Sequence, residues 1–327
     1  MLSRTPKQRI FRVAVNGLPY FCRKLSNLVD GDGWSVPYRS PFHPAGLAAR
    51  FVDLARCDLA YSWTGKISMG KFLRAARALK KEKIVLLWCG SDVLFAKEEL
   101  RRGKMDPWVS NLVHWAVSPC LAEEVRSLGI ACEYVQASFV QPVQPSPLPE
   151  EFSVLVYAPS VKREQLYGLD HVLEVANQLP RIRFRLVGLR ERHLPGCPTN
   201  LEVHGHVDMD RFYREATVIW RPVRHDAGIS FMVLEALAHG RHILYSYPFP
   251  GCVHVAEVGP ACKEIERLRD LHASQTLNLN ENGRQVVAQD FSPQVVRSRL
   301  LQRWKEIILG PDRAPSSSRV YLPSATS

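Results

Sequence analysis

Short apolar runs alternate with amphipathic stretches along most of the chain. Residues 84–88, 154–157 and 218–220 are such runs, and each leads into a polar loop and then a helical pattern. Strands that alternate with helices in this way favour parallel sheets covered by helices on both faces. We therefore predict an α/β fold.

One proline-rich segment interrupts this alternation. Residues 141–149 contain four prolines, which favour an extended linker over a helix or a strand. The 327 residues of the chain also exceed the size at which a single core usually divides. We predict two domains, a linker and an aperiodic, flexible tail. The predicted parts are an N-terminal domain at residues 1–140, the linker at 141–150, a C-terminal domain at 151–310 whose closing helix at about 291–309 packs back toward the N-terminal domain, and the tail at 311–327.

Composition and cysteine usage indicate a globular protein from a reducing compartment. Hydrophobic residues make up 46% of the chain, which is enough for packed cores. The eight cysteines are scattered without a Cys-x-x-Cys pair, so we expect most to be reduced core residues, with Cys89, Cys120 and Cys132 in apolar surroundings. No signal-peptide-like stretch precedes Phe11, and no apolar run approaches the ~18 residues of a membrane span. We predict a cytoplasmic location.

Positive charge is concentrated in the N-terminal part. The formal net charge is +11, and residues 1–150 hold 21 Lys and Arg against 13 Asp and Glu. Part of the excess lies in an amphipathic helical pattern within residues 65–83. Two interpretations stay open: an ordinary surface helix, or a surface through which the basic N-terminal domain makes peripheral contact with an anionic membrane. We predict no nucleic-acid binding, because neither basic residues interleaved with exposed aromatic residues nor a known binding module is evident.

Candidate chemistry is concentrated in residues 224–246. There Asp226 and Glu235 bracket a glycine-containing loop, and a helical pattern begins after the loop. The start of a helix presents unpaired N–H groups and partial positive charge, which suit a diphosphate. A carboxylate at Glu235 could accept hydrogen bonds from a ribose diol. This pattern predicts a nucleotide-sugar site, and the ordinary alternative is a common α/β loop followed by a solvated glutamate.

The same segment resembles the C-terminal signature of retaining glycosyltransferases with the GT-B fold, family 4 (glycosyl transferases group 1). The order of strands and helices across residues 154–222, and the closing helices at 282–296, also resemble this family. The N-terminal half resembles it more weakly, at residues 12–19, 84–93 and 116–125. The resemblance implies two Rossmann-like parallel-sheet domains that face a central cleft.

The resemblance also implies roles for residues of the C-terminal domain. Asp226 resembles the family's acid near the transferred sugar and is the candidate catalytic residue, whereas Glu235 resembles the acid that holds the ribose. Lys162 and Arg163 are the candidate cations for the donor diphosphate. The anion site would be completed by backbone N–H groups near Gly228, Ile229 and Ser230.

Two positions depart from the family pattern. Asp226 precedes Glu235 by nine positions, one more than in the family, so either the loop has gained a residue or Asp226 has shifted from that role. Tyr167 stands immediately before the glycine of the first helix, where the family has a lysine. Lys162 or Arg163 would then serve as the replacement cation.

In the N-terminal domain, two loop residues are site candidates with ordinary alternatives. Gly17 either lets its loop approach the donor or forms a tight turn. Asp92 either contacts an acceptor or caps the following helix. His114, His204 and His206 lack metal-ligand spacing and are expected to be structural, and we expect neither a metal nor a cofactor.

The resemblance implies a transferase. A metal-independent, retaining hexosyltransferase would move a sugar from a nucleotide-diphosphate sugar to a glycan or lipid-linked acceptor, in cell-surface polysaccharide or glycolipid biosynthesis. Fixed cations and N–H groups aimed at the leaving diphosphate would lower the barrier without a metal ion. Two alternatives stay open: a GT-B-like nucleotide-sugar epimerase, and a non-catalytic nucleotide-sugar-binding partner.

Overall fold

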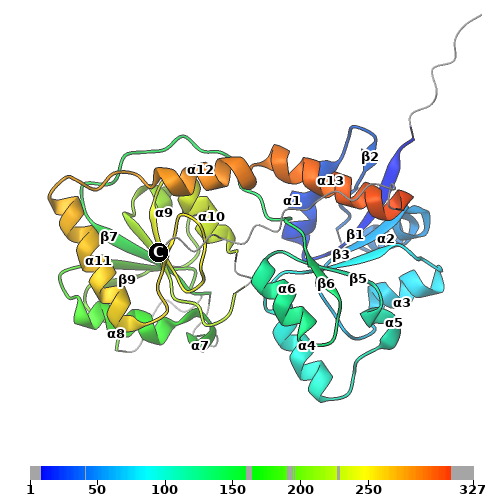
Figure 1. The fold of residues 1–327 in the computed structure, drawn as a ribbon, viewed down its shortest axis with the longest axis horizontal. Coiled ribbons are helices and arrows are strands. Elements are labelled where there is room, and N and C mark those ends of the chain that lie inside the picture. The colour runs from blue at the N-terminus through cyan, green and yellow to red at the C-terminus, as the bar shows by residue number, and fades with distance from the viewer. Residues whose placement is uncertain are drawn as a thin grey trace, which may run out of the picture. The chain divides into compact units, whose positions relative to one another are not determined.

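The structure is a computed structural model that describes residues 9–40, 42–159, 164–189, 194, 196–226 and 229–310. Contacts divide these residues into two compact units. The first comprises residues 9–137 and 296–310, and the second comprises residues 138–295. Each unit contains one six-stranded sheet whose strands pair in parallel (Figure 1). The predicted architecture of two Rossmann-like parallel-sheet domains is confirmed.

The strands of the first unit are β1 (Phe11–Gly17), β2 (Trp34–Ser35), β3 (Leu59–Trp63), β4 (Ile84–Trp88), β5 (Val113–Ala116) and β6 (Cys132–Tyr134). The helices between them are α1 (Pro19–Val29), α2 (Pro44–Arg56), α3 (Lys71–Ala78), α4 (Asp92–Arg101), α5 (Pro107–Ser110) and α6 (Pro119–Arg126). The sheet order is β2-β1-β3-β4-β5-β6, so the direction of strand addition reverses between β1 and β3. Open α/β sheets bind ligands at such reversals, beyond the carboxyl ends of the strands.

Apolar side chains of the first sheet alternate between its two faces, as the period of a strand requires. Ala60 of β3 and Leu86 of β4 pack with Leu73 of α3 on one face. Tyr61 lies on the opposite face, where its ring packs edge-on against Trp304 at a centroid distance of 5.1 Å. Helices therefore cover both faces of this sheet.

The closing helix α13 (Pro293–Leu309) packs on the first unit. Its buried side chains recur every fourth residue, which places them on one face of the helix. They are Val296, Leu300, Trp304 and Ile308. Arg297 of the same helix pairs with Asp32 at 2.8 Å.

The strands of the second unit are β7 (Ser153–Tyr157), β8 (Arg183–Val187), β9 (Leu201–Val203), β10 (Val218–Arg221), β11 (His242–Tyr245) and β12 (Val253–His254). Its helices are α7 (Glu164–Tyr167), α8 (Leu169–Gln178), α9 (Met209–Arg214), α10 (Phe231–Ala238), α11 (Val258–Ala273) and α12 (Glu281–Asp290). The sheet order β12-β11-β10-β7-β8-β9 is that of dinucleotide-binding Rossmann domains. Here the reversal lies between β7 and β10.

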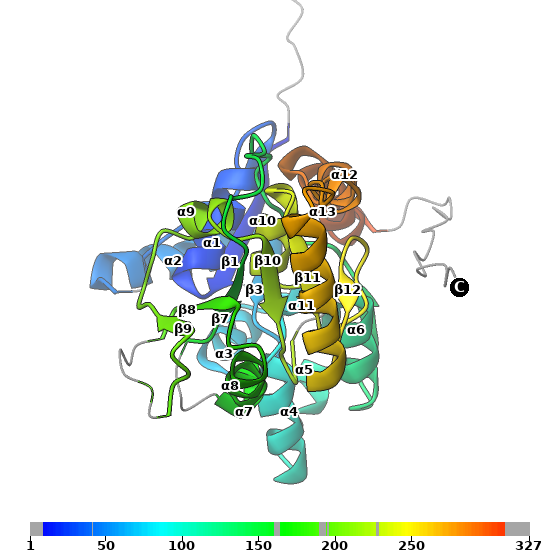
Figure 2. The same ribbon diagram turned by 90° about the vertical axis from the view of Figure 1, so that its left-hand side faces the viewer.

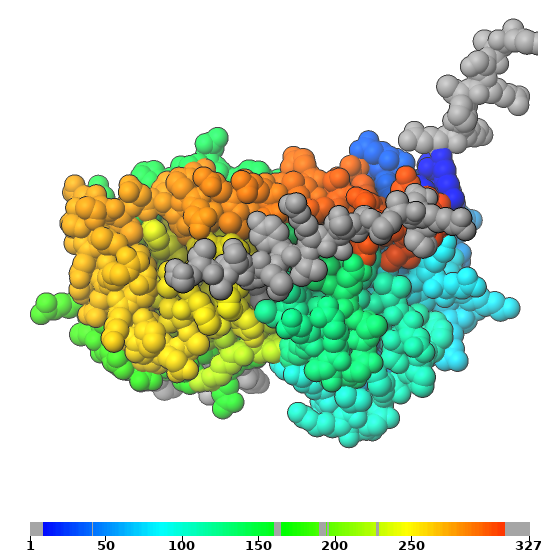
Figure 3. All heavy atoms as spheres, in the orientation of Figure 1, coloured from blue at the N-terminus to red at the C-terminus, as the bar shows by residue number. Residues whose placement is uncertain are grey.

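The second sheet is also covered on both faces. Val156 of β7 packs with α8 and α11, whereas its neighbour Leu155 packs with α10 and α12. In Figure 2, α8 lies below the strands of this sheet, whereas α9, α10 and α12 lie above them. In the space-filling view, α11 forms part of the outer surface of this unit (Figure 3).

The proline-rich segment 141–149 is extended and is held against the second unit by Arg241. Arg241 is fully buried, and its guanidinium donates to Ser146 Oγ at 2.5 Å, to the Pro147 carbonyl at 3.1 Å and to the Tyr213 carbonyl at 2.8 Å. Burial lowers the pKa of Arg241 to about 10. Carbonyl and hydroxyl oxygens thus replace the water around this cation.

Cysteine burial agrees only partly with the sequence-based expectation. All eight cysteines are free. Cys132 is buried and Cys89 is half-buried, but Cys120 is exposed, because it lies on the solvent side of α6 while Leu121 and Ala122 face the core. The expectation of apolar surroundings for Cys120 is therefore wrong.

The part of the chain that the structure describes contains no helix both long and apolar enough to cross a membrane.

Candidate functional site

The reversal between β7 and β10 places two side chains at the carboxyl edge of the second sheet. β7 ends at Tyr157 and β10 ends at Arg221. The parallel register pairs Trp220 with Val156, so Arg221 and Tyr157 lie side by side where the two strands end. Ligands of doubly wound sheets bind in the crevice beyond such strand ends.

Arg221 is a buried cation with one nitrogen left unpaired. Its side chain is only 8% exposed, and its guanidinium carbon lies 5.7 Å from the ring centroid of Tyr157 and 5.0 Å from that of Tyr167. Nε and one terminal nitrogen donate to Oδ2 of Asp226 at 3.4 and 3.2 Å. The other terminal nitrogen has no hydrogen-bond partner among the described residues. A buried charged donor without a partner is costly.

Electrostatics keep Arg221 charged. Burial alone lowers its pKa, but the Asp226 carboxylate outweighs burial, and the pKa is raised. A permanent positive charge therefore lies at the carboxyl edge of the second sheet.

Asp226 is the counter-ion of Arg221. Its Oδ2 also accepts a hydrogen bond from the Tyr245 hydroxyl at 3.2 Å, and its backbone N–H donates to the Tyr247 hydroxyl at 3.2 Å. Burial and the adjacent carboxylate raise the pKa of Tyr245, which stays a neutral hydrogen-bond donor. These contacts orient the carboxylate toward the guanidinium.

A glycine allows the loop after β10 to reach the start of α8. Gly168 has φ +63°, and a Cβ atom there would lie 1.8 Å from the Pro222 carbonyl oxygen. Arg224 joins the same two segments, because its backbone N–H donates to the Leu166 carbonyl at 3.0 Å and its side chain pairs with Asp170. This close approach brings Tyr167 over Arg221.

Glu235 lies on α10 and is half-buried. Its carboxylate accepts a hydrogen bond from the Tyr213 hydroxyl at 2.9 Å. Tyr213 is buried on α9, so the carboxylate is positioned by the core rather than left loose in solvent. Ile229 and Ser230 are buried residues directly before α10. Of the other predicted donor residues, Lys162, Arg163 and Gly228 lie outside the described residues.

The two N-terminal candidates have structural reasons for their identity. Gly17 ends β1 with φ +149°, and a Cβ there would lie 2.9 Å from Cβ of Trp63 on the adjacent β3. Asp92 accepts hydrogen bonds from the backbone N–H groups of Gly65 at 2.8 Å and Gly90 at 2.9 Å, and also from Cys89. Burial raises the pKa of Asp92 despite these bonds. Its carboxylate braces the loops after β3 and β4.

The histidines have other partners. Nδ1 of His114 accepts a hydrogen bond from the Trp88 indole at 3.0 Å, and its Nε2 lies 2.9 Å from the Val109 carbonyl oxygen. His204 lies 3.4 Å from a carboxylate oxygen of Glu202, and His206 is exposed. Nowhere in the described ranges do three His, Cys, Asp or Glu side chains come together as a metal site.

Residues 153–262 match the family glycosyl transferases group 1. This group 1 region runs from β7 into α11 and contains Arg221, Asp226 and Glu235. No curated protein sequence matches the chain.

Solved glycosyltransferase structures resemble the whole chain in fold. A glycosyltransferase from Rickettsia africae is 12% identical, with 94% of this chain and 100% of that chain covered and a TM-score of 0.62. HepE from Anabaena, in complex with UDP-glucose, is 13% identical, with 91% and 99% covered and a TM-score of 0.65. The pneumococcal O-GlcNAc transferase GtfA, in complex with UDP and GlcNAc, is 12% identical, with 81% and 60% covered and a TM-score of 0.56. The predicted GT-B fold is confirmed.

Arg221 is the residue of the group 1 region that sequence reasoning missed. It was part of a predicted strand, and no role was assigned to it. A signal was nevertheless present, because an arginine ends the otherwise apolar run Val218-Ile-Trp. Buried arginines are rare unless they are paired or bind a ligand.

Proposed function

We propose that this chain is a glycosyltransferase that binds a nucleotide-diphosphate sugar at the carboxyl ends of β7 and β10. The unpaired guanidinium nitrogen of Arg221 carries the proposal. In the proposed complex, the unpaired nitrogen of Arg221 donates a hydrogen bond to an oxygen of the donor diphosphate. The group 1 match across residues 153–262 and the GT-B fold support this assignment.

The positive charge of Arg221 would act on the leaving group. A nucleoside diphosphate departs with added negative charge, and a fixed cation at the departing oxygens lowers the barrier more than one that must be desolvated. Lys162 and Arg163 would contribute further cations, and backbone N–H groups at 228–230 would complete the anion site. Glu235, held by Tyr213, would accept the ribose hydroxyls.

The proposed reaction is a direct transfer. The acceptor hydroxyl oxygen forms a bond to the anomeric carbon, the bond from that carbon to the diphosphate oxygen breaks, and the hydroxyl proton leaves on a diphosphate oxygen. We include retention of configuration and independence of a metal ion, as the family resemblance implies. Asp226 has its Oδ2 on Arg221 and Tyr245, so we assign it the role of counter-ion rather than sugar contact.

We further propose a hexose donor and a glycan or lipid-linked acceptor, in cell-surface polysaccharide or glycolipid biosynthesis. HepE was solved with UDP-glucose and GtfA with UDP and GlcNAc, which supports a uridine donor as the first to test. A cytoplasmic location with peripheral contact to anionic membrane, through the basic first unit, belongs to the same proposal.

Titration with UDP tests the donor site. UDP that binds only the folded state raises the melting temperature. At a hundredfold excess over Kd it adds about 2.7 kcal/mol to the free energy of unfolding. We expect Arg221→Met to weaken UDP binding roughly tenfold or more, because a hydrogen bond to a charged group contributes about 1.5–3 kcal/mol. The double variant Arg221→Met with Asp226→Asn removes the carboxylate that the single variant would leave uncompensated. Arg211→Gln, which removes an exposed arginine of the same unit, is the control.

The outcomes separate the candidate functions. UDP release from UDP-glucose only in the presence of an acceptor supports the transferase. A changed sugar without release indicates an epimerase, and binding without turnover indicates a non-catalytic partner. Equal UDP affinity in the wild type and both Arg221 variants would contradict the assigned site.

A further inference from the structure

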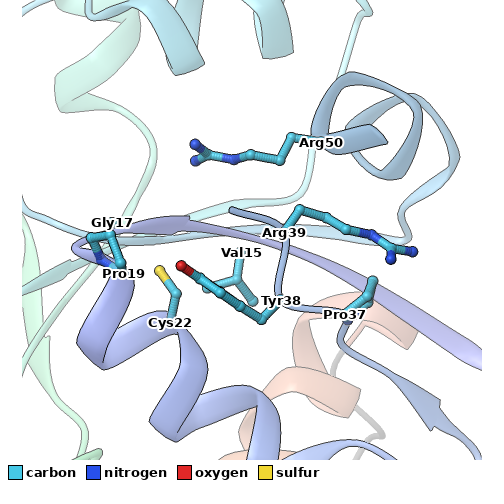
Figure 4. A pocket seen from close by; sticks show the side chains of 8 residues that line it. All are labelled: Val15, Gly17, Pro19, Cys22, Pro37, Tyr38, Arg39 and Arg50. Atoms are coloured by element: carbon cyan, nitrogen blue, oxygen red, sulfur yellow. The ribbon is translucent and has the colours of Figure 1, made fainter. Parts of the chain in front are cut away.

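A small hollow lies in the first unit beside the end of β1. It is about 240 Å³ in volume, including space open to solvent. Because this volume includes open solvent, the hollow has room for a small group at its mouth and not for a whole enclosed ligand. Its lining comes from β1, α1, the loop before α2, and α2 itself (Figure 4). The lining residues are Val15, Gly17, Pro19, Cys22, Pro37, Tyr38, Arg39 and Arg50.

Arg50 is the cation of this hollow. Its guanidinium donates to Oδ1 of Asn16 at 2.8 Å, and Nδ2 of Asn16 donates to Ser62 Oγ at 3.1 Å. These bonds hold Arg50 at the carboxyl ends of β1 and β3, where the strand order of the first unit reverses. No carboxylate lies within ion-pair distance of Arg50 in the described residues. Its charge is therefore available to a ligand.

Arg39 differs from Arg50 although both line the hollow. Arg39 pairs with Asp53 at 3.2 Å. In Figure 4 the guanidinium of Arg39 points away from Gly17, whereas that of Arg50 extends over the side where Gly17 and Cys22 lie. The charge of Arg50 also reaches Cys22, because it opposes the burial that raises the pKa of that thiol to about 11.

Three further features beside Arg50 suit an anion. The Tyr38 hydroxyl makes no hydrogen bond to any described residue, and it points toward Cys22 in Figure 4. Arg23 stands over the Tyr38 ring, with its guanidinium carbon 5.2 Å from the centroid. Helix α1 begins at Pro19 beside the hollow, and the start of a helix carries partial positive charge. Donors thus approach from several elements, and no acidic residue lines the hollow.

We propose that this hollow binds a phosphoryl group of the acceptor, with Arg50 and the Tyr38 hydroxyl as its hydrogen-bond donors. That the ligand is a glycosyl acceptor rests on the proposed function. Arg50 and Tyr38 reach the hollow from different elements, and arginine is well suited to the oxygens of a phosphoryl group.

Two carriers of the phosphoryl group fit the surroundings. One is a soluble phosphorylated saccharide. The other is a lipid phosphate, since α2 turns an apolar face to solvent on which Leu47, Phe51 and Val52 are 54%, 53% and 43% exposed. The experiment distinguishes the two carriers.

Thermal unfolding in sodium phosphate, compared with sodium chloride at equal ionic strength, tests the site. All proteins carry Arg221→Met with Asp226→Asn, which removes the proposed diphosphate contact from the second unit. We expect Arg50→Gln to weaken the apparent phosphate affinity roughly tenfold or more, as the loss of a charge-assisted hydrogen bond implies. Arg56→Gln, at the exposed end of the same helix, should respond like its parent. Equal responses of Arg50→Gln and its parent would overturn the proposal, as would an equal loss in Arg56→Gln.

Sedimentation with vesicles identifies the carrier. If phosphatidylcholine vesicles bind the protein only when they contain phosphatidic acid, and if both Arg50→Gln and Phe51→Ser abolish binding, the phosphoryl group is lipid-borne. A phosphate response without vesicle binding identifies a soluble carrier. UDP titration of Arg50→Gln in the otherwise wild-type chain distinguishes the two proposals. Unchanged UDP binding would show that the donor site does not depend on Arg50. If the wild type fails to bind UDP, the donor assignment falls while the phosphate result on the first unit remains.

Discussion

The guanidinium carbon of Arg221 lies over the ring of Tyr167, 5.0 Å from its centroid. The family resemblance implies a lysine at the position of Tyr167. In this chain a cation is placed beside that position by Arg221 of β10 instead. Contact between an arginine and an aromatic face contributes about 0.5–2 kcal/mol, more when the pair is shielded from water. Arg221 is shielded, and Tyr157 contacts its guanidinium as well.

Substitution of Tyr167 tests this contact. Tyr167→Phe keeps the ring, and we expect its unfolding free energy to stay close to that of the wild type. Tyr167→Leu removes the ring and should lower the unfolding free energy by about 1–2 kcal/mol, measured by urea denaturation. The loss should shrink when Arg221 is already Met, because contacting residues are not additive. An undiminished loss in that background would mean that the ring acts through packing alone.

The hydroxyl of Tyr213 is predicted to position Glu235 for the ribose. Tyr213→Phe removes the 2.9 Å hydrogen bond. We expect the unfolding free energy to fall by about 1 kcal/mol, the usual contribution of one hydrogen bond. UDP affinity should fall as well, and Glu235→Ala should abolish the shift of the melting temperature with UDP.

Tyr134→Phe is the matched control for Tyr213→Phe. It removes a hydroxyl that donates to Gln136 in the first unit at 3.3 Å. Calorimetric titration should give it the UDP affinity of the wild type. If Tyr213→Phe also binds UDP normally, the assigned place of Glu235 on the ribose is wrong.

The close approach at Gly168 predicts a large effect from one methyl group. Gly168→Ala must place a Cβ 1.8 Å from the Pro222 carbonyl, at φ +63°. Gly103 has nearly the same φ, +66°, but no described atom lies within 4 Å of the position that a Cβ would take there. Gly103→Ala should therefore cost about 1–2 kcal/mol from the left-handed backbone alone.

Gly168→Ala should exceed that cost by about 1–3 kcal/mol, because the loop after β10 must move away from α8. The same movement should weaken UDP binding in Gly168→Ala and leave it unchanged in Gly103→Ala. Denaturation of the two variants side by side measures the difference. Equal losses would show that Pro222 yields without strain.

Stability should fall in mild acid. Burial lowers the pKa of His114 below its ordinary value of 6.5 in the folded protein. In the unfolded chain the pKa of His114 returns to about 6.5. Below that pH the unfolded chain binds a proton that the folded protein does not bind, so the free energy of unfolding falls. The Trp88 indole N–H donates to Nδ1 of His114, and this bond requires that nitrogen to be unprotonated.

Urea denaturation between about pH 7 and pH 5 measures this loss. His114→Gln should reduce the slope of the unfolding free energy against pH by up to about 1.4 kcal/mol per pH unit. A smaller slope should persist, because burial also lowers the pKa of His239 and His242. An identical slope in His114→Gln would show that His114 does not titrate in this range.

Local pattern was sufficient for most of the secondary structure. The apolar run at 154–157 lies within β7, and the run at 84–88 coincides with β4. The helical pattern after Asp226 forms α10, with Glu235 on it. Period and turn chemistry are properties of neighbouring residues, so they can be recognised without knowledge of the rest of the chain.

The assigned chemistry was less accessible. Asp226 was expected near the transferred sugar because it stands close to a family position, and the structure pairs its carboxylate with Arg221. Asp92 was expected either to contact an acceptor or to cap the following helix, and the structure shows its carboxylate bonded to the backbone N–H groups of Gly65 and Gly90 instead. Neither contact can be predicted from the local sequence, because an aspartate residue can bind a ligand, a guanidinium or a backbone amide.

The amino-acid order alone was enough to predict parallel α/β units covered on both faces and to single out residues 224–246 as the candidate donor region. It did not reveal that Arg221 lies between Tyr157, Tyr167 and Asp226, nor that Arg50 is joined to Asn16. Those neighbours arise from the order in which strands pair, β10 beside β7 and β3 beside β1. Strand order is determined by packing of the whole unit, because an apolar run specifies that a strand must be buried but not which strand will lie beside it.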